Sequence, residues 1–220
     1  MRRISLLIPA CSLLLLSACG GGPTLTYKLT VDSTDDARRT ELVSASARVI
    51  ERRLLGLKQE VQAGDVSVNS DTVTVKTADS ETAEALRTQL QGAFTMRVMR
   101  EVEPEIADIS SETMGAWKET GITEKEFDWV LAASSEPRPK AKATILFRDT
   151  GKTLLKTVFQ ENKGKAIGIF LRGNLMSKIM VTDSTPSESV VVDGIPNLEI
   201  AHVFADDVNV GLHVRFEEVK

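Results

Sequence analysis

The chain reads Val66-Ser67-Val68-Asn69-Ser70-Asp71-Thr72-Val73-Thr74-Val75 at the point that decides its fold. Apolar and polar residues alternate on both sides of a polar turn, which is the pattern of a β-hairpin. Before the hairpin, Tyr27–Val31 alternates in the same way and predicts a strand. A stripe of apolar residues spaced by three and four over residues 42–57 predicts an amphipathic helix between the two.

Beyond the hairpin, a second helix and a fourth strand are expected. Asp79 or Ser80 caps a helix that carries Ala83, Leu86 and Leu90 on one side. Phe94-Thr95-Met96-Arg97-Val98 then alternates as a strand. The order β-α-β-β-α-β is that of a ferredoxin-like unit, which we assign to residues 27–99.

Residues 100–140 are interpreted as a connector. Thr123 and Glu126 have the spacing of a capping box, so a short helix is expected over Glu124–Ala133. Trp117 and Trp129 have two interpretations, as ligand-stacking aromatics or, more commonly, as buried anchors of a connector.

Residues 141–220 predict a second α+β unit of the form βαββ. Ala143–Phe147 reads as a strand, and Asp149 or Thr150 caps the helix that follows. Ala166–Leu171 is almost continuously apolar, as in a central strand, and Gly173-Asn174 is a two-residue hairpin loop before Leu175–Val181. Alternation over residues 208–216 predicts a last strand. The whole is an α+β fold.

The N-terminus predicts export and a lipid anchor. Arg2 and Arg3 precede an apolar run from Ile4 to Leu16, and Leu16-Ser17-Ala18-Cys19 resembles a bacterial lipoprotein cleavage and lipidation motif. The run is too short for the ~20 residues of a spanning helix. We therefore expect a signal peptide at 1–18, diacylation of Cys19, and a Gly-rich tether at 19–26. A diacylated cysteine would hold the protein durably on the extracytoplasmic face of a bacterial membrane.

Composition narrows the function classes. The 220 residues carry 27 basic and 31 acidic side chains, and loss of Arg2 and Arg3 makes the mature chain more acidic still. A mixed acidic surface argues against a nucleic-acid binder. With Cys11 removed and Cys19 lipidated, the folded part has no cysteine for disulfides or metal ligands.

The order of these motifs resembles the SecD family of preprotein translocase subunits. Tyr27–Val31, Ile50-Glu51-Arg52-Arg53-Leu54 and Thr72–Val75 are similar to the start of its first extracytoplasmic domain, and Trp117–Thr123 is similar to that domain's connector. Thr144–Phe147, Gly151, Phe159, Asn162, Gly164-Lys165 and Arg172-Gly173 are similar to the domain's head. The resemblance implies a ferredoxin-like base plus a head subdomain, outside the cytoplasm.

This chain departs from the family in three respects. It carries no bundle of membrane helices, so the family's ion-driven motor is not implied. Arg172 replaces an aspartate of the hairpin, which leaves the role of that turn open. The end of the chain, Phe204-Ala205-Asp206-Asp207 and a charged strand, also differs from the family.

Motifs for catalysis or metal binding are weak. Asp149-Thr150-Gly151-Lys152-Thr153 lacks the first glycine of a P-loop and the second copy of an aspartic-protease motif. His202 and His213 are eleven residues apart and are expected on different elements, and Asp206-Asp207 lacks the spacing of a calcium loop. We assign no catalytic, cofactor or metal residues.

Two functions follow as expectations. The first is a non-enzymatic lipoprotein that assists protein export, with unfolded polypeptides or Sec translocase components as partners. It would act by strand addition at an exposed sheet edge, with Thr144–Phe147 and Leu175–Val181 as candidates, and through an apolar groove between the subdomains. The alternative is an envelope lipoprotein that binds a ligand or has a structural role. The oligomeric state stays open.

Overall fold

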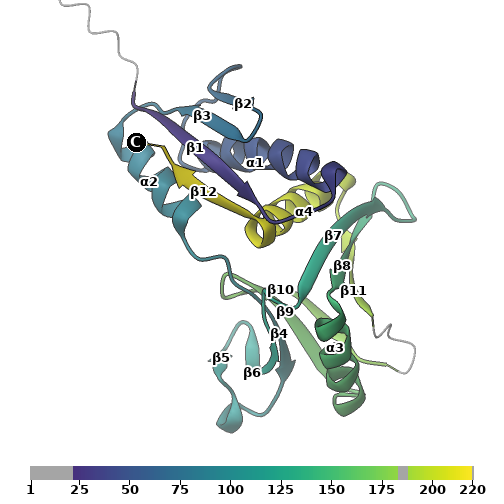
Figure 1. Ribbon diagram of the computed structural model, residues 1–220. Helices are drawn as coiled ribbons and strands as arrows, with labels where there is room; N and C mark the ends of the chain where they lie inside the picture. Colours follow the sequence, from purple (N-terminus) through teal and green to yellow (C-terminus); the bar gives the residue numbers. More distant parts are fainter. Residues whose placement is uncertain (1–21, 183–187, 220) are drawn as a thin grey trace, which may run out of the picture.

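The computed structural model describes residues 22–182 and 188–219. Within them the chain forms four α-helices, twelve strands and one short 3-10 helix (Figure 1). In chain order these are β1 (Thr24–Val31), α1 (Asp36–Gly56), β2 (Val66–Asn69), β3 (Thr72–Lys76), α2 (Ser80–Gln91), β4 (Met96–Glu101), η1 (Pro104–Ile106), β5 (Ile109–Ser111), β6 (Gly115–Ile122), β7 (Phe127–Ser134), β8 (Ala141–Phe147), α3 (Asp149–Glu161), β9 (Ala166–Leu171), β10 (Asn174–Met180), β11 (Ser189–Ile195), α4 (Leu198–His213) and β12 (Val214–Glu218). The predicted α+β class is confirmed.

Strands β1 to β3, helices α1 and α2 and the C-terminal strand β12 form a base with the strand order of a ferredoxin-like sheet. The order is β12-β1-β3-β2, and every neighbouring pair is antiparallel. Helices α1 and α2 start where the side chains of Asp35 and Asp79 accept backbone N–H groups of the first turn. Inward residues of β1 and β3, such as Tyr27 and Val73, pack with Leu42, Ile50 and Leu86 of the helices in one core.

The fourth strand of the base differs from the prediction. We expected it over residues 94–98, but the strand at that place, β4, pairs with β9 and β6 in a different sheet. The strand that completes the base is β12, from the end of the chain. Met96, Val98 and Met99 are all fully buried because β4 is covered on both faces, as a central strand is. Alternation identified the strand but not its sheet.

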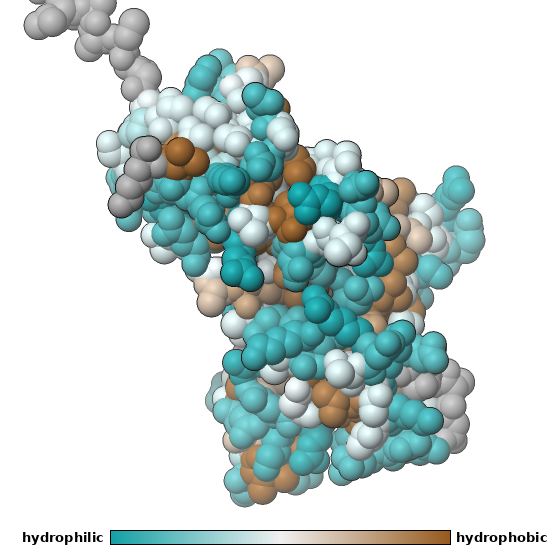
Figure 2. Space-filling view, in the orientation of Figure 1, coloured by the Kyte–Doolittle hydropathy of each residue, from teal (hydrophilic) through white to brown (hydrophobic). Residues whose placement is uncertain are grey.

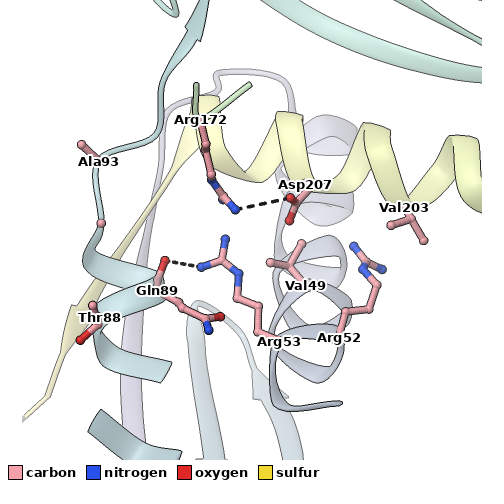
Figure 3. Close-up of a pocket in the computed structure, with 10 residues that line it drawn as sticks. Val49, Arg52, Arg53, Thr88, Gln89, Ala93, Arg172, Val203 and Asp207 are labelled. Carbon is pink, nitrogen blue, oxygen red and sulfur yellow. Dashed lines mark hydrogen bonds and ion pairs between the residues drawn. The ribbon is translucent and has the colours of Figure 1, made fainter. Parts of the chain in front are cut away.

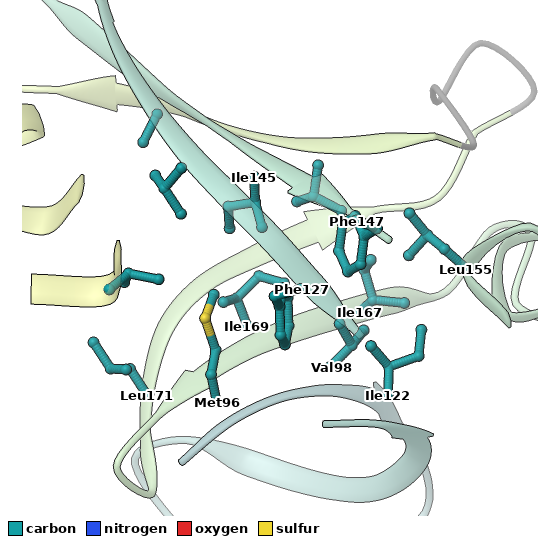
Figure 4. Packing of buried hydrophobic residues seen from close by; sticks show 14 of the residues in the cluster. Met96, Val98, Ile122, Phe127, Ile145, Phe147, Leu155, Ile167, Ile169 and Leu171 are labelled. Carbon is teal, nitrogen blue, oxygen red and sulfur yellow. The ribbon is translucent and has the colours of Figure 1, made fainter. Parts of the chain in front are cut away.

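The rest of the chain forms a head with two sheets. One has the order β10-β9-β4-β6-β5 and the other β11-β8-β7. Between them lies the largest apolar core, to which both sheets, α3 and α4 contribute (Figure 4). Phe127 and Phe147 stack at its centre with ring centroids 4.9 Å apart. The predicted strand-helix-strand-strand series is present as β8, α3, β9 and β10, although β8 belongs to a different sheet from the other two.

The helix expected over Glu124–Ala133 is wrong, because Phe127–Ser134 forms the strand β7. One bond of the capping box forms, since the backbone N–H of Thr123 donates to Glu126 Oε2 at 2.8 Å, but the Thr123 hydroxyl donates to the same oxygen at 2.9 Å and the N–H of Glu126 donates to the Thr123 carbonyl instead. They close a turn between β6 and β7 instead of starting a helix. Pairing with β8 then buries Phe127, Trp129 and Val130, which outweighs local preference.

The last strand expected over residues 208–216 is partly wrong. Residues up to His213 belong to α4, and only Val214–Glu218 is extended. Helix α4 has two apolar sides: Ala205 and Val208 pack into the head core, and Val210 packs into the core of the base. Two buried faces on one helix produced an alternation that resembles a strand.

Candidate functional site

Helix α4 joins the base to the head. Asp206, 7% exposed, accepts Arg48 Nε at 2.9 Å and Arg48 Nη2 at 2.8 Å, and lies 3.2 Å from Arg52. These bonds fix α4 to α1. On the other side, Asn209 donates to the carbonyl of Val130 at 2.9 Å and accepts its N–H at 2.8 Å. One helix therefore sets the position of β7 against the base.

The two candidate strands for strand addition differ in position. β8, which contains Thr144–Phe147, lies between β11 and β7 and has no free edge, so that prediction is wrong. β10, which contains most of Leu175–Val181, is the last strand of its sheet within the described residues. The second candidate is thus a sheet edge, as expected.

The β10 edge carries exposed methionines. Met176 and Met180 are 46% and 54% exposed, and the pairing with β9 is irregular at Met176. Lys178, a residue type that normally protects an edge, donates to Glu101 at 2.6 Å and lies 5.7 Å from the ring of Trp117. Its charge is thereby held against the protein's own sheet.

The edge at β7 is partly occupied. Because Asn209 bonds both backbone groups of Val130, this strand has no free pair at its centre. Beside it lies the apolar groove expected between the subdomains, lined by residues of α1, β7 and α4 including Leu42, Trp129 and Leu131. Its volume is about 190 Å³, below the ~300–1,000 Å³ of typical ligand sites. Figure 2 shows apolar surface in several separate areas of a mostly hydrophilic exterior.

The tryptophans are buried anchors. Trp117 is fully buried, donates from Nε1 to the carbonyl of Met114 at 2.6 Å, and meets Phe170 edge-on at 5.5 Å between ring centroids. Trp129 is 7% exposed and packs into the core of the base, with the Arg38 guanidinium 4.8 Å above its ring. Both tryptophans therefore support the interpretation as buried anchors over that as ligand-stacking aromatics.

The histidines lie on one helix, which corrects the expectation that they occupy different elements. His202 is exposed and His213 is buried, and eleven residues of α4 place them roughly 16 Å apart along its axis. His213 Nε2 lies 2.6 Å from the carbonyl of Asp128, and burial lowers the pKa of its imidazole below 6.5. Over residues 22–182 and 188–219, no group of three or more His, Cys, Asp or Glu side chains is placed to hold a metal.

The Gly-Lys-Thr segment lies inside a helix. Asp149 is the first residue of α3 and bonds Lys152 at 3.0 Å, while Arg148 is the N-cap and donates from Nε to the carbonyl of Phe127. Gly151 is buried, and a Cβ there would lie 2.4 Å from the carbonyl oxygen of Glu126. The glycine thus permits close packing of α3 on the turn before β7.

The predicted lipidation residue, Cys19, lies outside the described residues. In the part of the chain that the structure describes, no helix has the length and hydropathy needed to cross a bilayer. Arg53 and Arg172, which share a cavity, were not predicted as site residues. The only sequence signal was the unusual arginine in the β9–β10 turn.

The fold is similar to solved structures of SecDF. A crystal structure described as SecDF, a translocon-associated membrane protein from Thermus thermophilus, matches 90% of this chain with a TM-score of 0.52 and 14% identity. This chain spans 30% of that one. A structure described as a membrane component SecDF that enhances protein export matches with a TM-score of 0.48 and 14% identity, over 90% of this chain and 99% of the other. No protein-family model and no curated protein matches. At this identity the likeness establishes a SecD-like fold.

Proposed function

We propose that the protein is a non-catalytic, membrane-anchored accessory of protein export that holds extended polypeptide segments. The observation that carries the proposal is the β10 edge, where backbone groups of an outer strand lie beside Met176 and Met180. An extended chain adds to such an edge through main-chain hydrogen bonds, which makes binding tolerant of sequence. Methionine side chains adapt to varied apolar partners.

Two further points support this function. The fold is shared with SecDF, which is described as translocon-associated. The guarding charge at Lys178 is engaged with Glu101, so it does not oppose a strand that arrives at the edge. Anchoring through a diacylated Cys19 would keep the edge beside the membrane that exported chains leave.

The test is suppression of aggregation. A disulfide-containing model protein is unfolded by reduction, and its light scattering is followed with the full-length lipoprotein in detergent micelles. We expect the wild type to delay scattering at small molar excess, and the double variant Met176→Lys/Met180→Lys to lose most of the delay because two charges then face the incoming strand.

Leu55→Lys is the matched control, because Leu55 is 57% exposed on α1, far from the β10 edge in sequence and on another element. It should behave as the wild type. Absence of any delay at tenfold excess, or an equal loss in both variants, would remove the β10 edge from the proposal.

A further inference from the structure

Two arginines face each other across a cavity between the base and the head. The cavity has a volume of about 440 Å³ and is lined from α1, α2, α4 and the β9–β10 turn. In Figure 3 the guanidinium of Arg172 points toward that of Arg53 from the opposite wall. Like charges in this arrangement repel each other unless an anion lies between them.

Each arginine is held in place. The Arg53 guanidinium donates to the carbonyl of Gln89, at the end of α2. Arg172 occupies the left-handed region at φ 49°, its N–H donates to the carbonyl of Thr95 at 2.9 Å, and its guanidinium lies 5.8 Å from the ring of Phe94. The facing arrangement is therefore built by the backbone of two separate elements.

The charges around the cavity do not balance. Arg48 and Arg52 share Asp206, Arg48 also pairs with Glu41, and Arg172 lies 3.7 Å from Asp207. Arg53 has no carboxylate within ion-pair distance among residues 22–182 and 188–219, and burial together with the charge of Arg172 lowers its pKa. Three arginines and one carboxylate line the cavity. Arg52 pairs with Asp206 and Arg172 lies near Asp207, so the positive charge of Arg53 is left over.

The rest of the lining favours binding over simple solvation. Val49, Ala93 and Val203 form apolar parts of the wall, and guanidinium groups hold oxyanions more strongly where water is partly excluded. The same two arginines line an adjoining cavity with Arg215 and Glu217, a pair that adds no net charge. Planar guanidinium groups present parallel N–H donors that match carboxylate and phosphate oxygens.

We propose that Arg53 and Arg172 form a binding site for a small-molecule oxyanion, a phosphate or carboxylate group held between the two guanidiniums. Asp207 competes with this ligand for Arg172. The site is separate from the β10 edge and does not depend on the function proposed above.

The experiment measures thermal unfolding of the full-length protein in detergent micelles, with inorganic phosphate titrated against chloride at constant ionic strength. A second arm uses citrate, which distinguishes a carboxylate from a phosphate preference. We expect at least one anion to raise the melting temperature beyond the chloride control. Arg172→Asn keeps a residue that tolerates positive φ and should weaken this binding about tenfold or more, the value of one lost charge-assisted contact.

Asp207→Asn should act in the opposite direction and tighten binding, because it removes the competing carboxylate. Arg97→Asn is the matched control, since Arg97 pairs with Glu119 away from the cavity lining. If Arg53 and Arg172 only brace the fold, wild type and Arg172→Asn will respond equally to the anions. That outcome, or no response beyond chloride, would overturn the proposal.

Discussion

The imidazole of His213 is buried at the junction of base and head. Its Nε2 contacts the carbonyl of Asp128, while Nδ1 is buried without a hydrogen-bond partner in the described part of the chain. The ring packs on Trp129 with centroids 5.4 Å apart. Burial lowers its pKa, the positive charge of Arg148 acts in the same direction, and Asp128 and Asp32 oppose it. The folded protein therefore favours the neutral ring.

This predicts that stability falls in mild acid. Since the folded pKa lies below the unfolded value of about 6.5, the unfolded chain binds more protons. The contribution of His213 to the free energy of unfolding should therefore be complete above about pH 6.5. It should be lost as pH falls through the folded pKa. Urea unfolding at pH 7.5 and pH 5.0 measures the difference. His213→Gln should reduce it, and His202→Gln, an exposed position on the same helix, should leave it intact; equal pH dependence in all three proteins would contradict the assignment.

At the scale of an element, the Asn209 side chain occupies the outer edge of β7 and so ends that sheet. Its amide bonds both backbone groups of Val130, in the manner of a neighbouring strand. Asn209→Ala should leave a buried donor and a buried acceptor unpaired, at about 1–3 kcal/mol each. Asn209→Asp should be at least as destabilising at neutral pH, because it places a buried, ionised carboxylate oxygen against the carbonyl of Val130. Chemical denaturation measures both; an alanine variant as stable as the wild type would show that water replaces the amide.

Sequence reasoning at this scale succeeded where a pattern was local. The hairpin Val66–Val75 and the cap of α2 at Asp79 were predictable because their hydrogen bonds join residues close in the chain. β7 was missed because the Thr123–Glu126 bonds are equally compatible with a turn before a strand. α4 was missed because its two sides serve different cores, and sequence alone does not show a second partner.

In the candidate site, too, local features were predictable from the sequence and long-range contacts were not. The β10 edge was predictable, since the turn at Arg172-Gly173 makes the next segment a hairpin partner of β9. The central position of β8 could not be predicted from the sequence, because it depends on pairing with β7 and β11. The facing of Arg53 and Arg172, 119 positions apart in the chain, arises only from the packing of the β9–β10 turn against α1 and α2.

At the scale of the whole molecule, the base depends on the last strand of the chain. β12 pairs with β1 from Tyr27↔Glu218 to Val31↔Val214, and Glu218 binds Arg87 of α2 at 2.9 Å. A chain that ends after His213 should therefore lose hydrogen-exchange protection in β1 and unfold cooperatively in the base. A synthetic peptide of residues 212–220, added in excess, should restore part of it; full protection of β1 in the shortened chain would show that three strands are sufficient.

The same pairing has a mechanical consequence. Because β1 and β12 are antiparallel and Tyr27 lies opposite Glu218, the start of β1 and the end of β12 lie at the same end of this strand pair. Its hydrogen bonds run across the strands, so tension between the two ends loads them one after another from Tyr27 onward. A weak force would therefore separate β12 from β1 by breaking one hydrogen bond at a time. Strands pulled along their length in opposite directions would instead resist with all their hydrogen bonds at once.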